Sequence, residues 1–356
     1  MARFIPIILA GGKGERFWPV SRLKRPKQFL CLDGGDRSLL QSTADRLLPL
    51  ASWESLFVIT ASHLADGVTQ QLPEIPAENI LVEPQGRDTA PAVAWATLEV
   101  AKRYGEDAIC GFFPADHYIT DEQRYCDTLR AAADLAKQEG AIATLGIKPT
   151  FASTGYGYIE QDSEVGTFSA GVVTDLPAYK VSRFTEKPDR ETAEGFLHSG
   201  RYSWNSGMFI FPAAVMLAEL KTHAAEMTHA LMEKGVDAYA TLEKLSIDYA
   251  VMEKTDRAYV MPANFGWDDL GDWNAIERLL KGSEENVALC QHVGLDTNGS
   301  ILYSDDADEL IVTIGLEDVV VVRDGNATLI VKKERTQDIK AAVRKIGAQE
   351  RFQHLL

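Results

Sequence analysis

The sequence contains no apolar run that approaches the roughly 20 residues needed to cross a bilayer. The apolar stretch near the start, residues 4–10, is short and contains Pro6, and it leads into a charged glycine-rich loop instead of a spacer. These features argue against a secretory signal peptide. We therefore expect a cytoplasmic protein with no membrane partner.

Cysteine motifs and an excess of basic charge are also missing. The cysteines are Cys31, Cys110, Cys126 and Cys290. They show no CxxC spacing and no nearby histidine at metal-ligand spacing, so we interpret them as reduced thiols. Lys and Arg number 36 against 52 Asp and Glu, a formal net charge of −16. This balance argues against a general nucleic-acid-binding protein, because such a protein needs a broad basic surface.

The remaining composition is that of a globular protein, with 46% hydrophobic and 25% charged residues in a chain of 356. Its first two thirds alternate short apolar segments with amphipathic ones. Strands are predicted at 4–10, 56–60, 80–83, 108–113 and 142–147, and helices after the capping box at Ser38 and at 89–104, 129–137, 191–198 and 213–232. The alternation predicts an α/β fold, a Rossmann-like, doubly wound and mostly parallel sheet. Ligands of such sheets bind beyond the carboxyl ends of the strands.

The character of the sequence changes near residue 282. Short strands are predicted beyond it at 300–303, 310–314, 319–323 and 328–331, followed by a helix at 337–346. We predict a catalytic domain at 1–282 and a small β-rich domain at 283–356, for which a left-handed β-helix is one candidate arrangement. Two roles stay open for this second domain, packing on the first domain or forming the contact of a homodimer.

The first predicted strand runs directly into a loop of glycine and basic residues, 11–19 (GGKGERFWP). Glycines let the backbone turn sharply and bring its amides close to phosphate. The loop lacks the Lys-Ser/Thr ending of a P-loop, and Phe17 and Thr60 stand where a dinucleotide site needs a glycine and an acid. Basic residues recur at Lys13, Arg16, Arg22, Lys24, Arg25 and Lys27. A solvated basic surface is one interpretation, but a triphosphate site suits the pattern better.

This loop, with the run 26–28 (PKQ) that follows, resembles the signature of the sugar-phosphate nucleotidyltransferases. Leu9 and Ala10 before the glycines, and residues 17–19 after them, resemble the mannose-1-phosphate guanylyltransferase branch of that family. Ordered motifs extend the resemblance to about Lys281. Because the chain stops at Leu356, the isomerase domain of some relatives is expected to be absent.

The resemblance implies a nucleotide-binding set in two segments. Residues 83–91 (EPQGRDTAP) face the base in the family, although Asp88 replaces the usual asparagine; a carboxylate can still accept hydrogen bonds from guanine. By chemistry alone, the same segment is a turn and helix cap. The implied nucleotide-binding residues are Leu9, Ala10, Gly11, Gly12, Lys13, Gly14, Glu83, Arg87, Asp88, Thr89 and Ala90.

The resemblance also implies a metal site and a sugar site. Asp116, after the predicted strand 108–113, and Asp269, in the run 266–273 (GWDDLGDW), are the implied ligands of a Mg²⁺ cofactor. Asp268 and Asp272 fit that position less well. The implied sugar-binding residues are Gly157, Glu186, Lys187 and Asn205. Residues 246–250 (SIDYA) match the family too, and we interpret them as a capped helix that supports the site.

The implied reaction converts GTP and α-D-mannose 1-phosphate into GDP-mannose and diphosphate. Arg16 would bind the outer phosphates, Lys27 would stabilise charge near the α-phosphate, and Lys187 would position the attacking phosphate. No general base is needed because that phosphate is already ionised. Three alternatives stay open: another sugar phosphate or base, a non-catalytic nucleotide-sugar sensor, and a nicotinamide-dependent oxidoreductase.

Overall fold

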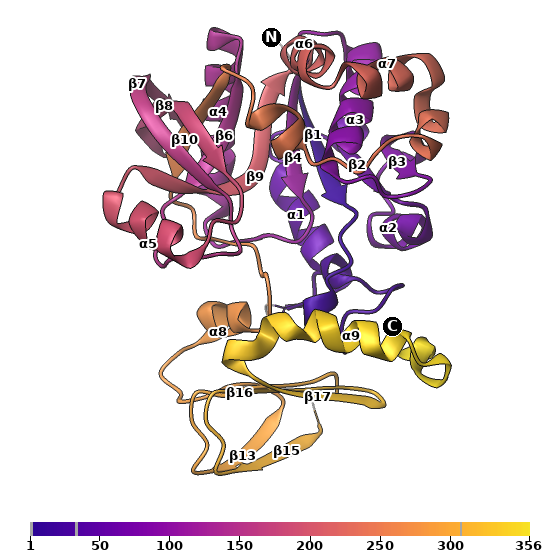
Figure 1. Cartoon of the computed structure of the whole chain (residues 1–356), viewed down its shortest axis with the longest axis vertical. Helices are drawn as coiled ribbons and strands as arrows, with labels where there is room; N and C mark the ends of the chain where they lie inside the picture. The colour runs from indigo at the N-terminus through magenta and orange to yellow at the C-terminus, as the bar shows by residue number, and fades with distance from the viewer. Residues whose placement is uncertain (1–2, 33–34, 307) are drawn as a thin grey trace. The chain divides into compact units, whose positions relative to one another are not determined.

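The computed structural model describes residues 3–32, 35–306 and 308–356, drawn as a ribbon in Figure 1. The chain forms two compact units. Unit 1 comprises the chain up to Gly11, Thr43–Pro114 and Ile119–Trp267; unit 2 comprises Gly12–Ser42, Ala115–Tyr118 and Asp268–Leu356. Unit 2 thus gathers three stretches that are far apart in the sequence. The predicted division of the sequence after residue 282 stays a prediction.

Unit 1 is built around a sheet of nine strands in the described part of the chain, in the order β3-β2-β1-β4-β9-β6-β10-β8-β7. Its strands are β1 Phe4–Ala10, β2 Phe57–Ala61, β3 Ile80–Glu83, β4 Ile109–Pro114, β6 Ile142–Ile147, β7 Tyr158–Ala170, β8 Val173–Thr185, β9 Tyr202–Pro212 and β10 Ala258–Ala263. Its helices are α2 Ala65–Gln71, α3 Thr89–Tyr104, α4 Glu122–Glu139, α5 Arg190–Ser199, α6 Ala213–His223 and α7 Ala225–Lys234. Three elements each contain a residue pair at which the chain changes from one unit to the other: α1 Leu39–Leu47, β5 Tyr118–Ile119 and β11 Trp267–Asp268.

The predicted α/β class is confirmed. Strands β3, β2, β1 and β4 are parallel neighbours, as are β6 and β10. Strand β9, which the sequence analysis did not predict, enters antiparallel between β4 and β6. Strands β7 and β8 form one long antiparallel pair. The predicted helix 213–232 is interrupted at Ala224, which separates α6 from α7.

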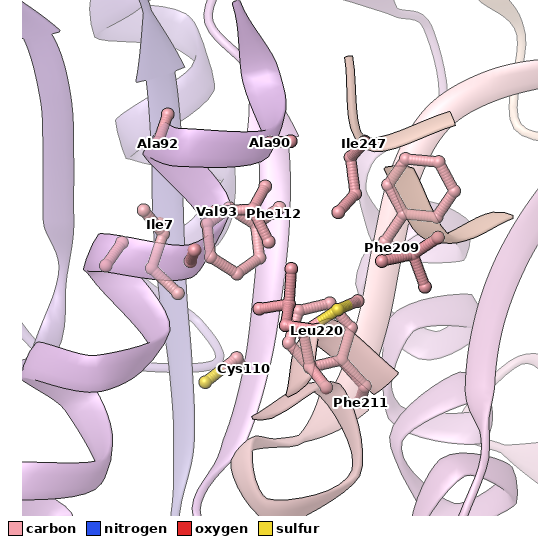
Figure 2. Packing of buried hydrophobic residues seen from close by; sticks show 14 of the residues in the cluster. Ile7, Ala90, Ala92, Val93, Cys110, Phe112, Phe209, Phe211, Leu220 and Ile247 are labelled. Carbon is pink, nitrogen blue, oxygen red and sulfur yellow. The ribbon is translucent and has the colours of Figure 1, made fainter. Parts of the chain in front are cut away.

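Helices cover both faces of this sheet. On β4, the Phe112 ring stacks on Phe211 at 5.5 Å between centroids and belongs to a buried cluster that includes residues of α3 and α6. Figure 2 shows this cluster. The next residue, Phe113, points to the opposite face, where its ring meets Tyr125 of α4 at 6.3 Å. Because side chains alternate along a strand, β4 is buried on both faces, as its continuous apolar sequence predicts.

Unit 2 contains the predicted small β-rich region. Its elements are α8 Asn274–Leu280, β12 Val287–Leu289, β13 Gln291–Leu295, β14 Ile301–Ser304, β15 Leu310–Ile314, β16 Val319–Asp324, β17 Ala327–Lys332 and α9 Ile339–Gly347. Strands β12, β14 and β16 are successive parallel neighbours, and β13 pairs in parallel with β15. Strand β17 closes the first row antiparallel. Two rows of short parallel strands are typical of a β-helix. The handedness of this β-helix stays a prediction.

One core joins parts of unit 2 that are far apart in the sequence. Phe17 of the glycine-loop segment and Trp273 are both fully buried, and their rings lie 5.1 Å apart. Ile339, the first residue of α9, is 2% exposed and belongs to the same cluster. The glycine loop, the run after Trp267 and the C-terminal helix therefore hold one another in place within this unit.

Candidate functional site

A pocket of about 260 Å³ in unit 2 brings together charged side chains from distant stretches. It is lined by Lys13, Gly14, Glu15, Arg16, Phe17, Lys27, Asp116, His117, Asp269, Gly271 and Lys340, and we call it the charged pocket. It contains residues predicted to bind the triphosphate and both predicted metal ligands. Lys340, from α9, was not predicted.

Lys27 is the centre of the charged pocket. It is 4% exposed, and its Nζ donates to Asp116 Oδ2 at 2.9 Å and to the carbonyl oxygen of Asp269 at 2.5 Å. Partial burial of the Asp116 side chain, which is 35% exposed, would raise its pKa. The Lys27 ammonium, with a smaller contribution from His117, outweighs this and holds the pKa of Asp116 below its ordinary value. Asp116 therefore stays ionised at neutral pH.

Gly14 makes room for Lys27. Its φ of 62° is in the left-handed region, and a Cβ placed there would lie 2.3 Å from Lys27 Cβ and 2.8 Å from the Lys27 nitrogen. The Gly14 carbonyl accepts hydrogen bonds from Ser21 Oγ at 2.7 Å and from the Phe17 amide at 2.9 Å. The loop therefore has one defined conformation that depends on a residue without a side chain.

We expect Gly14→Ala to lower the free energy of unfolding by about 2 to 4 kcal/mol, because it adds left-handed strain to an overlap with Lys27. The matched control is Gly12→Ala. A Cβ at Gly12 meets nothing within 4 Å, so Gly12→Ala should change the free energy of unfolding by no more than about 0.5 kcal/mol. Urea denaturation of the two variants decides the matter, and equal stabilities would contradict the described loop.

The predicted basic cluster divides into two groups. Arg22 and Arg25 reach the Asp324 carboxylate at 2.9 and 3.5 Å, so they connect the loop to β16. Arg16 stays in the charged pocket, where its Nη1 donates to the Gly271 carbonyl at 3.2 Å. Its buried Nε has no hydrogen-bond partner among the described residues. Such a donor is costly to leave unsatisfied, which makes Arg16 a ready partner for a phosphate oxygen.

The three aspartates of the run 266–273 have different surroundings. Asp268 pairs with Arg278 at 2.7 Å, and Asp272 accepts hydrogen bonds from Thr336 and Gln337. Only Asp269 lines the charged pocket, with its Oδ1 accepting from the Gly271 amide at 3.1 Å. Its neighbour Leu270 has a φ of 45°, a strained backbone of the kind that collects at functional sites.

The donor set of the charged pocket fits Mg²⁺. Among the described residues, no three His, Cys, Asp or Glu side chains are grouped to hold a metal ion. Mg²⁺ does not need such a group, because it is commonly bound by one or two carboxylates together with substrate phosphates and water. Asp116 and Asp269 line one pocket and supply those two carboxylates.

A second pocket, of about 590 Å³, lies within unit 1. It is lined by Asp88, Thr89, Glu186, Lys187, Lys244, Leu245, Ser246, Asp248 and Tyr249, and we call it the polar pocket. Residues that were predicted separately for the nucleotide and for the sugar thus meet in one place. Two of them, Asp88 and Lys187, have positive φ values of 70° and 46°.

The four residues predicted to bind the sugar lie together. A Cβ at Gly157 would lie 2.6 Å from Glu186 Oε2, and the Gly157 carbonyl accepts from the Asn205 amide at 2.8 Å. Glu186 forms an ion pair with Lys187. The Asn205 side chain donates from Nδ2 to Asp248 Oδ1 at 3.0 Å. A side chain at 157 would therefore displace the Glu186 carboxylate from its position beside the Gly157 backbone.

Asp248 is the residue that the sequence analysis missed in unit 1. Burial, with the negative charge of Glu186 adding to it, raises the pKa of Asp248 to about 6. Its position is fixed by Ile247, which is 3% exposed in the core of Figure 2 and donates its amide to Thr89 Oγ1 at 2.9 Å. The family match of residues 246–250 was the available signal, although the sequence alone favours a capped helix that supports the site.

The predicted base-binding segment is firmly held. Arg87 donates to the carbonyls of Tyr239 and Ala240 at 3.0 and 3.1 Å, and Asp88 caps α3 by accepting from the Thr89 amide at 2.8 Å. Ala90 is buried and donates its amide to the Leu245 carbonyl at 2.9 Å. The helix-cap and base-binding interpretations of this segment are therefore compatible, because only Oδ1 of Asp88 accepts the capping hydrogen bond.

The first strand is anchored in the same unit. Leu9 and Ala10 end β1, and the Ala10 carbonyl accepts from the Thr60 hydroxyl at 2.9 Å. Gly11 follows in unit 1, whereas Gly12 and Lys13 begin unit 2. All three are exposed, so their backbone and side-chain donors are accessible to a ligand.

Glu83 predicts a pH-dependent stability. Burial raises its pKa from 4.5 to about 7, with Tyr239 opposing and Asp88 adding to the shift. The folded state then holds this proton more tightly, so stability falls as pH rises from 4.5 to 7, by about 3 kcal/mol in total. We expect Glu83→Gln to remove this dependence in urea denaturation between pH 5 and 8. The control Glu74→Gln, at an exposed position, should keep the pH dependence of the free energy of unfolding. Parallel pH profiles for Glu83→Gln and wild type would refute the assignment of this dependence to Glu83.

Comparison with known proteins identifies the family. A model of the nucleotidyl transferase family matches residues 5–286. The chain belongs to the nucleotidyl transferase family. A second model, of the mannose phosphate isomerase/GMP-like β-helix domain, matches residues 290–346. The family resemblance and the β-rich C-terminal region predicted from the sequence are therefore confirmed.

Several relatives of this nucleotidyl transferase extend over nearly its whole length. A mannose-1-phosphate guanylyltransferase of Salmonella montevideo is 38% identical over 365 residues, covering 98% of this chain and 75% of the relative. Xanthan biosynthesis protein XanB of Xanthomonas campestris is 41% identical over 370 residues, with 99% and 75% covered. A crystal structure described as mannose-1-phosphate geranyltransferase from Thermus thermophilus is 33% identical, with a TM-score of 0.85 and 97% and 99% of the two chains covered.

Proposed function

We propose that this nucleotidyl transferase converts GTP and α-D-mannose 1-phosphate into GDP-mannose and diphosphate. The observation that carries the proposal is the buried Lys27 ammonium, held by Asp116 and by the Asp269 carbonyl in a pocket with two further cations of the glycine loop. This arrangement suits a triphosphate beside a divalent cation. The names of the relatives supply the choice of guanine and mannose.

Residues of the glycine loop and of the charged pocket bind and orient the nucleotide. The Gly11, Gly12 and Gly14 amides and Arg16 bind the outer phosphates, and Lys27 stabilises the charge that develops at the α-phosphate. A phosphate oxygen of the sugar phosphate attacks the α-phosphorus in line. A new phosphorus–oxygen bond forms as the bond to the β-phosphate oxygen breaks, and diphosphate leaves with that electron pair.

We propose that Asp116 and Asp269 hold Mg²⁺ in the charged pocket. When bound, the ion screens the repulsion between the anionic reactants. Catalysis by the chain itself then consists of orientation and charge stabilisation, and no side chain has to remove a proton.

In unit 1, Glu83, Arg87, Asp88, Thr89 and Ala90 form the proposed base-binding segment. The polar pocket takes the sugar phosphate. Glu186 and Asn205 bind sugar hydroxyls beside Gly157, with Asp248 added to this set because it holds the Asn205 amide. Lys187 positions the attacking phosphate.

A substrate panel tests the function. Release of diphosphate is measured with GTP, ATP, UTP and dTTP against mannose 1-phosphate and glucose 1-phosphate, with and without Mg²⁺. We expect the GTP and mannose 1-phosphate pair to be fastest and to require the metal. Preference for another pair would replace the substrate assignment. Binding of GDP-mannose in calorimetry without turnover of any pair would indicate a sensor instead.

We further propose a cytoplasmic location. In the described residues no helix is long and apolar enough to span a membrane.

We also propose a homodimer. Large exposed apolar side chains line one face of β13 and β15, namely Val293, Leu295, Leu310, Val312 and Ile314. Such a face is typical of a protein contact. Sedimentation should give a dimer that Val312→Glu dissociates, and a monomeric wild type would refute this proposal.

A further inference from the structure

Lys340 reaches the charged pocket from the far end of the sequence. It follows Ile339, the buried first residue of α9, and lines the same pocket as Arg16 and Lys27. Ile339 packs in the cluster that contains Phe17, the residue next to Arg16. The backbone positions of Lys340 and Arg16 are therefore set by one shared core within unit 2.

A buried carboxylate fixes the segment that leads to Lys340. Asp272 is 9% exposed, and its Oδ2 accepts from Thr336 Oγ1 at 2.9 Å and from Gln337 Nε2 at 2.5 Å. Asn274 adds hydrogen bonds from its Nδ2 to the Lys333 carbonyl and to Thr336 Oγ1, each at 3.0 Å. The run that places Asp269 in the pocket thus also holds the beginning of the C-terminal helix.

We infer that the C-terminal helix completes the polyphosphate site: Lys340 is a binding residue for the outer phosphates of the nucleotide and for the diphosphate product, and Asp272 is its positioning residue. The inference rests on the proposed function and gives the β-helix region a part in it. The β-helix segment delivers a cation to the charged pocket, in addition to any role in oligomerisation.

The charge balance of the pocket supports this assignment. Without Lys340, its side chains supply three cations, on Lys13, Arg16 and Lys27, against three carboxylates, on Glu15, Asp116 and Asp269. A nucleoside triphosphate adds about four negative charges, of which the proposed Mg²⁺ offsets two, so a further fixed cation favours its binding. Lys340 provides this cation and leaves the polar pocket of unit 1 unaffected.

Calorimetric binding of inorganic tripolyphosphate in the presence of Mg²⁺ tests the inference on the full chain. We expect Lys340→Met to weaken binding about tenfold or more, and Lys340→Arg to restore most of it. The matched control is Lys345→Met, because Lys345 is an exposed lysine of the same helix that does not line the pocket. Its affinity for tripolyphosphate should stay within about twofold of the wild type. In kinetics, the KM for GTP should rise while the KM for mannose 1-phosphate stays unchanged.

The positioning role has its own readout. Asp272→Asn replaces the accepting Oδ2 by a donor, so it should weaken tripolyphosphate binding in the wild-type background and have no further effect in Lys340→Met. If Asp272→Asn weakens tripolyphosphate binding equally in the wild type and in Lys340→Met, Asp272 stabilises the pocket in general and does not position Lys340. Unchanged tripolyphosphate binding in Lys340→Met, or none in the wild type, would overturn the inference even if GTP is a substrate. Lys340-dependent binding without turnover would leave the inference standing and refute the proposed function.

Discussion

Replacing Lys27 with methionine is expected to lower kcat about 100-fold or more. The ammonium is the buried cation that contacts both Asp116 and the Asp269 backbone, and methionine keeps the apolar stem while removing the charge. The cost in stability should be much smaller, about 1 to 2 kcal/mol, because Asp116 is a third exposed and can be solvated when its partner is lost. Initial rates of diphosphate release and urea denaturation measure the two effects separately.

Lys24→Met is the control for Lys27→Met. Lys24 belongs to the same basic run, but its side chain is exposed, and the change in net charge is identical. This variant should keep nearly full turnover. A kcat of Lys27→Met within threefold of the wild type would remove Lys27 from the mechanism and leave the charged pocket as a structural ion cluster.

Asp269→Asn should lower turnover by a similar factor, about 100-fold or more, for a different reason. Asparagine keeps the Oδ1 acceptor for the Gly271 amide, so the turn and the free energy of unfolding should be preserved. What is lost is the negative charge that is proposed to hold Mg²⁺. The Mg²⁺ concentration that gives half-maximal rate should therefore rise, which a titration of rate against metal measures.

The neighbouring residue provides the control for Asp269→Asn. Asp268 points its carboxylate at Arg278 outside the charged pocket, so Asp268→Asn removes the same charge one position away. It should leave both kcat and the metal requirement close to wild type. If Asp268→Asn has the larger effect of the two, the proposed metal ligand is the wrong aspartate.

Much of unit 1 could be predicted because its signals are local. The strands β1, β3 and β6 have the predicted bounds, since each is a short, mainly apolar run; β1 and β6 are buried on both faces, whereas β3 is fully buried on one face only. Helix α3 begins and ends as predicted, between the cap at Asp88 and Gly105. Strand β9 was missed because its place between β4 and β6 depends on pairing with strands far away in sequence.

The candidate site residues that the sequence analysis named also carry local signals. Glycine and lysine in one loop, or a glutamate and lysine after one strand, are neighbours in the chain, and their chemistry can be read together. Asp248 and Lys340 join their pockets only through buried neighbours, Ile247 and Ile339, that pack against distant elements. No periodicity or capping pattern distinguishes either residue from a solvated surface charge, and only the family match of residues 246–250 pointed to Asp248.

The sequence by itself determined the α/β class, the glycine loop after β1 and the family to which the chain belongs. The tertiary structure decided which of the three aspartates in the run 266–273 enters the charged pocket, that Gly14 must lack a side chain because Lys27 fills its space, and that the end of the chain contributes a cation. The physical reason is the sequence separation over which each kind of interaction acts. Periodicity and capping act over a few residues, whereas the core of unit 2 is the sum of weak contacts between stretches more than 200 residues apart.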